Sequence, residues 1–222
     1  MTRPRTPPRS RRGPGRPPEH ERPGARDALL DAASWLFAHR GFGEVSLRQI
    51  AEEAGVSPAM VHYYFGDKAG LHEAMLARAV GRVLERVGEA ASGALDGPLG
   101  DDPVARVLDV MTRTVSQERW LAPLLVREVL AEGGRLRERF VRDYASVMAE
   151  IVQGLLRREV EAGRFRADLD PQLAFLSFMG MTVFPFVARP VAERVLGIDY
   201  DDAFVRRLAA HTERLFREGV RA

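Results

Sequence analysis

The residues of this chain that are best suited to chemistry share one face of a short expected helix. Their side chains can form hydrogen bonds or contact a thymine methyl group, and they are Pro58, Ala59, His62 and Tyr63. Base edges in the major groove of DNA are recognised by hydrogen bonds and methyl contacts of this kind. Helical spacing turns Val61 and Phe65 to the opposite face and leaves Met60 at the edge of the first one. The pattern therefore predicts a base-reading helix.

This helix is the second one of a helix-turn-helix pattern. Ser46 can cap the first helix, and Gln49, three residues later, completes a capping box. Gly55 breaks the first helix, and Ser57 can cap the second, where Pro58 takes the first helical position. In such an arrangement the second helix lies in the major groove. The alternative explanation of the bare pattern is a polar surface turn.

The rest of the chain predicts an all-α protein with about nine helices. Leu, Ala and Arg dominate the sequence, and strand-favouring runs of Val, Ile and Thr are missing. We expect one long helix from about 135 to 162 and an apolar helix that begins at Asp170-Pro171 and precedes the last helix. The expected parts are a disordered Arg/Pro-rich arm (1–25), a three-helix DNA-binding domain (26–86, with its helix-turn-helix at about 46–65) and a larger helical domain (87–222).

Several classes of protein are excluded by what the sequence lacks. It has no cysteine, so disulfides, thiolate metal sites and a catalytic thiol are ruled out. Its five histidines are scattered, and neither a nucleophile elbow nor a phosphate-binding glycine loop is present. We therefore expect no enzyme, no cofactor and no metal. No signal peptide is evident, and the charge-free run 171–188 contains Gly180 and Pro185 and is short for a membrane span. The sequence predicts a soluble, cytoplasmic protein with no membrane partner.

The N-terminal arm holds most of the positive charge. Residues 1–26 contain eight arginines and two glutamates, whereas the whole chain has a formal net charge of only +2. A proline-rich segment with few large apolar residues is expected to be disordered when free. A basic arm of this kind commonly binds a polyanion, and the alternative is a solubilising leader without a partner. Gly15-Arg16-Pro17 resembles the core of an AT-hook, which would place Arg16 in an A·T-rich minor groove.

From Ala28 to Leu76 the chain resembles the DNA-binding domain of the TetR family of bacterial transcription regulators. The matching pieces are ALLDAASWLFAHRGFGEVSLRQIAEEAGVS and the signature YYF-x-x-K-x-x-L, which ends at Leu71. The resemblance implies that Tyr64 and Lys68 contact phosphates. Further DNA contacts are implied for Ser46, Arg48, Ser57, Pro58, Ala59, Met60, His62 and Tyr63. Met60, where Thr or Ser is usual, and His62 depart from the family pattern and would change which operator is read.

The resemblance also implies roles for the larger domain, which would hold a small-molecule pocket and pair with a second copy as a four-helix bundle. The candidates for the interface are Phe184, Phe204, Leu208 and Leu215. The candidates for the pocket are Met111, Trp120, Phe140, Tyr144, Met148, Phe178 and Met179. An internal core is the alternative for both sets, since apolar residues at helical spacing are most often core. The scarcity of charge favours a largely apolar effector.

A ligand-responsive, homodimeric transcriptional regulator follows as the expected function. It would bind a palindromic operator in double-stranded DNA, act as a repressor and be released by a small-molecule effector. The alternatives are an activator of the same family, an architectural protein that binds DNA without sequence preference, and an enzyme that shares only the helical fold.

Overall fold

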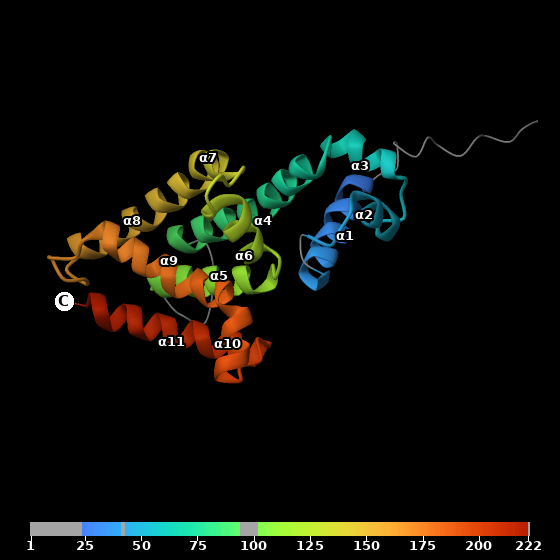
Figure 1. Cartoon of the computed structure of the whole chain (residues 1–222). Coiled ribbons are helices and arrows are strands. Elements are labelled where there is room, and N and C mark those ends of the chain that lie inside the picture. The colour runs from blue at the N-terminus through green and yellow to red at the C-terminus, as the bar shows by residue number, and fades with distance from the viewer. Residues whose placement is uncertain (1–23, 41–42, 94–101, 222) are drawn as a thin grey trace, which may run out of the picture.

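The structure, a computed structural model, describes residues 24–40, 43–93 and 102–221. Three helices form a head at one end of the molecule, and they are α1 (Ala25–Arg40), α2 (Leu47–Glu53) and α3 (Pro58–Phe65). The long helix α4 (Lys68–Ser92) leads from this head into the body (Figure 1). Within the described ranges the one strand-like pairing is an isolated bridge between Phe165 and Arg221. The prediction of an all-α protein is confirmed.

The body contains the remaining helices, two of which include π-helical sections. They are α5 (Pro103–Gln117), α6 (Leu121–Leu124) with η2 (Leu125–Leu130), α7 (Arg137–Phe140) with η3 (Val141–Ala145), α8 (Ser146–Glu161), α9 (Pro171–Val187), α10 (Arg189–Leu196) and α11 (Asp202–Val220). The long helix expected from about 135 to 162 is present as the continuous run of α7, η3 and α8. It is preceded by a tight turn at Gly134, where a Cβ atom would lie 2.7 Å from the carbonyl oxygen of Glu128.

Local capping signals begin these helices as the sequence predicts. The Oγ atom of Ser46 accepts from the backbone N–H of Gln49, and the Gln49 side chain accepts from the backbone N–H of Ser46, which completes the capping box. The carboxylates of Asp102 and Asp170 each accept two backbone N–H groups at the starts of α5 and α9. Ser57 departs from the prediction, because its side chain makes no capping hydrogen bond and Pro58 alone marks the start of α3.

Helix α10 is not anticipated from the sequence. The apolar helix ends at Val187, and the chain turns by 72° before the next helix begins at Arg189. Pro190 lies in the first turn of α10, where its missing N–H leaves no helical hydrogen bond unmade. No single helix among the described residues is long and apolar enough to cross a membrane. The bent pair of α9 and α10 reaches the required length and composition only when both are counted together.

Helix α4 belongs to both hydrophobic cores of the molecule. Met75 and Leu76 pack in a core that joins the head to Trp120 and to α6. Two turns later, Val83 and Val87 pack in the core of the body together with side chains of α5, α8, α9 and α11. Helix α4 therefore connects the core of the head to the core of the body, and the predicted domain boundary at residue 86 lies within this shared helix.

Candidate DNA-binding and effector sites

The outer face of α3 presents the four residues that the sequence assigns to base reading. Pro58, Ala59, His62 and Tyr63 are exposed, and Tyr63 has 68% of its surface accessible. On the opposite face Val61 is fully buried in the core of the head. The structure corrects the prediction for Met60. Its side chain is only 4% exposed and packs in the same core, so it is not placed to contact a base.

Two contacts orient the polar groups of this face. The Nδ1 atom of His62 lies 2.6 Å from the carbonyl oxygen of Gly66. Since a carbonyl can only accept, Nδ1 carries the proton, and Nε2 is left as the ring nitrogen available to a base edge. The ring of Tyr63 packs edge-on against the ring of Tyr64 at a centroid distance of 5.1 Å. These contacts set the direction of both side chains in the structure.

The residues expected to contact phosphates lie around α3 but differ in their availability. Arg48 is strongly exposed and pairs with Glu52, at 2.9 Å on the same helix. Tyr64 is half-buried, and the Oγ atom of Ser46 is engaged in the capping box. The ammonium group of Lys68 donates to the carbonyl oxygen of Val45, at 2.7 Å. Lys68 therefore joins the start of α4 to Val45, two positions before α2. Arg16 lies outside the described residues.

The body contains a partly open apolar cavity of about 160 Å³. It is lined by Val80, Val83, Met111, Val115, Leu121, Leu125, Phe140, Tyr144, Ala145, Met148, Phe175, Met179 and Val183. Five of the seven side chains that the sequence suggests for a pocket are in this lining. Trp120 and Phe178 are not. Trp120 packs in the core that joins the head to α6, and its indole N–H donates to the Glu118 carboxylate. Phe178 packs edge-on against Phe216 in the core of the body.

The sequence reasoning missed the contribution of α4 to this cavity. It placed the pocket in the larger domain (87–222), whereas Val80 and Val83 line the wall on the side of α4. On α9 it found Met179 but not Phe175 or Val183, which lie one turn to either side. That i, i+4 spacing is a signal that could have identified them.

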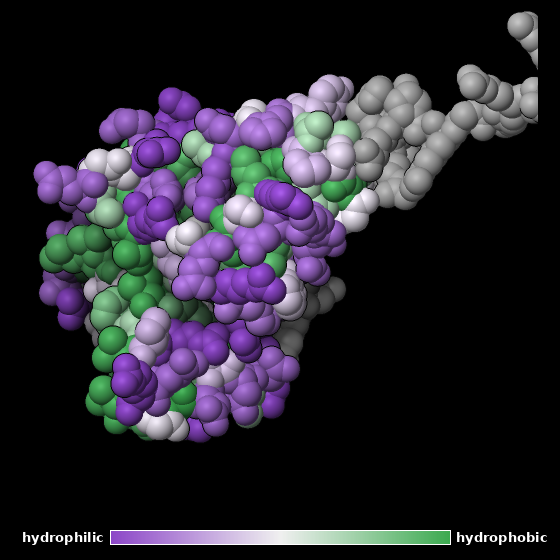
Figure 2. All heavy atoms as spheres, turned by 45° about the vertical axis from the view of Figure 1, so that its right-hand side comes forward, coloured by the Kyte–Doolittle hydropathy of each residue, from purple (hydrophilic) through white to green (hydrophobic). Residues whose placement is uncertain are grey.

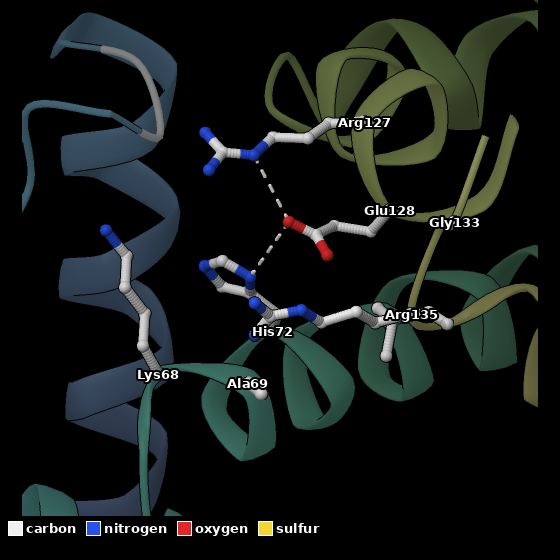
Figure 3. Close-up of a pocket in the computed structure, with 8 residues that line it drawn as sticks. Lys68, Ala69, His72, Arg127, Glu128, Gly133 and Arg135 are labelled. Carbon is white, nitrogen blue, oxygen red and sulfur yellow. Dashed lines mark ion pairs between the residues drawn. The ribbon is translucent and has the colours of Figure 1, made fainter. Parts of the chain in front are cut away.

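A second cavity, of about 380 Å³, lies between the start of α4 and the segment from η2 to α7. Its lining is polar and cationic, with Lys68, Ala69, His72, Arg127, Glu128, Gly133, Arg135 and Leu136 (Figure 3). Burial lowers the pKa of His72 to about 4, and the positive charges of Lys68, Arg127 and Arg135 act in the same direction. His72 is therefore neutral at pH 7. No feature of the sequence singled out this cavity.

The C-terminal helices α9, α10 and α11 expose an apolar surface. Its most exposed side chains are Leu173, Leu176, Phe184, Val191, Val195, Leu196 and Leu215. Figure 2 shows hydrophobic side chains gathered along one flank of the body. Of the residues expected at an interface, Phe184 and Leu215 are on this surface. Phe204 and Leu208 are partly buried and pack against the core of the body.

Comparison with known proteins agrees with this architecture. A family model described as bacterial regulatory proteins, tetR family, matches residues 29–75, and one described as tetracyclin repressor-like, C-terminal domain, matches 101–218. The HTH-type transcriptional repressor KstR2 of Rhodococcus jostii (strain RHA1) is 24% identical over 152 residues, which are 68% of this chain and 73% of that protein.

Two solved structures share the fold. The fatty acid degradation regulator FadR from Bacillus halodurans has a TM-score of 0.70 at 18% identity, with 90% of this chain and 97% of that chain covered. The ketosteroid transcriptional regulator KstR2 of Mycobacterium tuberculosis has a TM-score of 0.69 at 17% identity, with 89% and 95% covered. This chain therefore belongs to the TetR family of bacterial regulatory proteins, and it is a ligand-responsive DNA-binding transcriptional regulator.

Proposed function

We propose that this protein is a homodimeric repressor that reads a palindromic operator with α3 and is released by an apolar effector. The observation that carries the proposal is the division of α3 into two faces. One face is buried in the core of the head, and the other presents Pro58, Ala59, His62 and Tyr63 to solvent. A short helix anchored on one side and polar on the other suits insertion into a major groove. Such a regulator binds DNA and an effector in the cytoplasm and catalyses no reaction.

The remaining DNA contacts in this proposal fall on the backbone. Arg48 and Tyr64 would bind phosphates beside α3. Ser46 and Ser57, at the starts of α2 and α3, would lie near the DNA backbone. Phosphate contacts set the register of a protein on DNA, whereas base contacts give specificity. In a dimer, the two α3 helices would enter successive major grooves about 34–36 Å apart.

Replacing His62 or Tyr63 by Ala tests the assignment of the reading face. An operator is first selected from a randomised duplex library with the unmodified protein. We expect each variant to bind this operator more weakly by about 1–3 kcal/mol and to lose discrimination at one or two positions, because a base contact is removed. Affinity for random DNA should change little.

Glu85→Ala, an exposed change on α4, is the matched control and should behave as the unmodified protein. If the variants at His62 and Tyr63 both kept the full operator preference, α3 would not be the base-reading element.

The apolar cavity of the body is the proposed effector site. At about 160 Å³ it is smaller than the 300–1,000 Å³ that is typical of small-molecule sites, so an effector of usual size must push its walls apart. Val80 and Val83 of α4 belong to those walls. A bound effector would therefore favour a different position of α4 and, through it, of the head. The effector shifts the equilibrium only as far as it binds the two positions with different affinity. The names of the two structural relatives, a ketosteroid transcriptional regulator and a fatty acid degradation regulator, agree with an apolar ligand class.

Toluene is a suitable probe of this cavity, since a dry apolar cavity of about 150 Å³ is known to accept benzene. With methionine methyl groups labelled by ¹³C, toluene should shift the signals of Met111, Met148 and Met179. Met75, which is fully buried in the core of the head, is the internal control and should not shift.

Val115→Phe should fill the cavity and abolish these shifts, at a cost of about 1–3 kcal/mol in stability. Equal shifts at Met75 and at the three cavity methionines would show that toluene dissolves in the protein without a specific site.

A further inference from the structure

The cationic cavity between the head and the body has walls from two parts of the chain. Lys68, Ala69 and His72 come from the first two turns of α4, and the facing wall comes from η2 and the turn before α7. At about 380 Å³ the cavity is within the size range of small-molecule sites and is far larger than a single ion needs. It is separate from the apolar cavity, with which it shares no lining residue.

The charges in this cavity do not balance. Lys68, Arg127 and Arg135 face it, and Glu128 is the one carboxylate in its lining. His72 is neutral at pH 7, so the lining carries a net charge of +2. Some arginines elsewhere in the body have carboxylate partners, such as Arg113 with Asp109 and Arg189 with Glu193, whereas Arg137 donates to backbone carbonyl groups.

The single carboxylate is already shared. Glu128 is 9% exposed, and its Oε1 atom lies 3.3 Å from Nε of Arg127 and 3.7 Å from Nδ1 of His72. Figure 3 shows this carboxylate between the two side chains, with Arg135 extended beside His72. Among the described residues, Arg135 has no carboxylate within ion-pair distance. The lining thus keeps an excess of positive charge, although the carboxylate of Asp67 caps the N-terminus of α4 beside it.

The donor set indicates the chemistry of a ligand. Two guanidinium groups offer planar pairs of N–H donors, and these match the oxygens of a phosphate group. The Lys68 ammonium adds a point charge. A phosphate monoester or a pyrophosphate group carries enough negative charge and enough oxygens to occupy all three cations together.

We propose that this cavity binds the phosphate group of a small phosphorylated molecule. The bound phosphate lies between Arg127 and Arg135 and reaches Lys68, while Glu128 opposes binding as the competing carboxylate. Because the site joins α4 to η2, its occupant braces the head against the body. Binding of this anion and binding of DNA then alter each other's affinity by the same factor.

Calorimetric titration of the full-length protein with sodium pyrophosphate, at constant ionic strength and without metal ions, tests the proposal. We expect saturable binding of one pyrophosphate per chain. Arg127→Gln and Arg135→Gln should each weaken it about tenfold or more, because each removes a charge-assisted hydrogen-bond donor. Glu128→Gln keeps the side-chain shape, removes the competing charge and should tighten binding.

The matched control is Arg86→Gln, an exposed change of the same charge on α4 outside the cavity, and it should bind pyrophosphate as the unmodified protein does. Thermal unfolding of each variant reports whether it is folded. Three outcomes would overturn the proposal. Pyrophosphate could show no saturable binding, Arg86→Gln could weaken its binding as much as Arg127→Gln and Arg135→Gln do, or a folded Glu128→Gln variant could bind it no more tightly than the unmodified protein. If pyrophosphate failed to bind while Arg135→Gln weakened binding of random DNA, the cations would serve the DNA backbone, and a small-molecule site would be refuted.

Discussion

Phe184→Arg is expected to produce a folded monomer that binds a palindromic operator at least about a hundredfold more weakly than the unmodified protein. Phe184 is 63% exposed in a single protomer, and Leu176 on the same helix is 64% exposed. An arginine at this position is solvated in a monomer, but a dimer built on this surface would bury it without a partner. An unpaired buried charge costs several kcal/mol, and each 1.4 kcal/mol is a factor of about ten in association. Sedimentation velocity measures the change in assembly.

Three further variants complete this experiment. Phe178 is 1% exposed and packs against Phe216 in the core of the body, so Phe178→Arg should unfold the protein and does not test the interface. Leu130→Arg places the same charge on an apolar residue that is 66% exposed and belongs to η2, not to α9, α10 or α11, and this variant should remain dimeric. A dimer that survives Phe184→Arg and Leu176→Arg alike would exclude this surface as the interface.

Deletion of residues 1–22 is expected to flatten the salt dependence of DNA binding. Residues 27–72 carry six acidic and three basic residues, so the reading head is −3, whereas residues 1–26 are +6. Each phosphate that is neutralised steepens the log–log dependence on salt by about 0.9, so four engaged arginines add about 3–4. Between 200 and 50 mM salt, the truncated protein should therefore gain about a hundredfold less affinity than the full chain. Fluorescence anisotropy across a salt series gives both slopes.

The half-site preference should survive the deletion, since base reading is assigned to α3. A chain of full length with the arginines of residues 1–22 replaced by Gln separates charge from length and should match the deletion. Arg16→Ala alone should erase a preference for A·T-rich flanks if Gly15-Arg16-Pro17 acts as an AT-hook. An unchanged slope in the deletion variant would identify the arm as a leader that does not touch DNA.

Local sequence determined the helix starts and the two faces of α3. The capping box of Ser46 and Gln49 and the aspartate caps of α5 and α9 form within a few residues of each other, so their outcome depends little on the rest of the chain. The outward position of His62 and Tyr63 follows from the 3.6-residue period once Val61 is buried. These local rules, with the motif around Tyr64 and Lys68, were sufficient to indicate the family and its function.

Only the tertiary structure decided which apolar residues line a cavity and which fill a core. Met148 and Phe178 have the same apolar character and both lie on helical stripes, yet one faces the cavity and the other packs against Phe216. Met60 was expected at the edge of an exposed face but is covered in the core of the head. The cationic cavity likewise unites Lys68 and Arg135, which are 67 positions apart in the chain. Helical period specifies the direction of a side chain on its own helix, whereas a cavity depends on how several distant helices fail to fill the space between them.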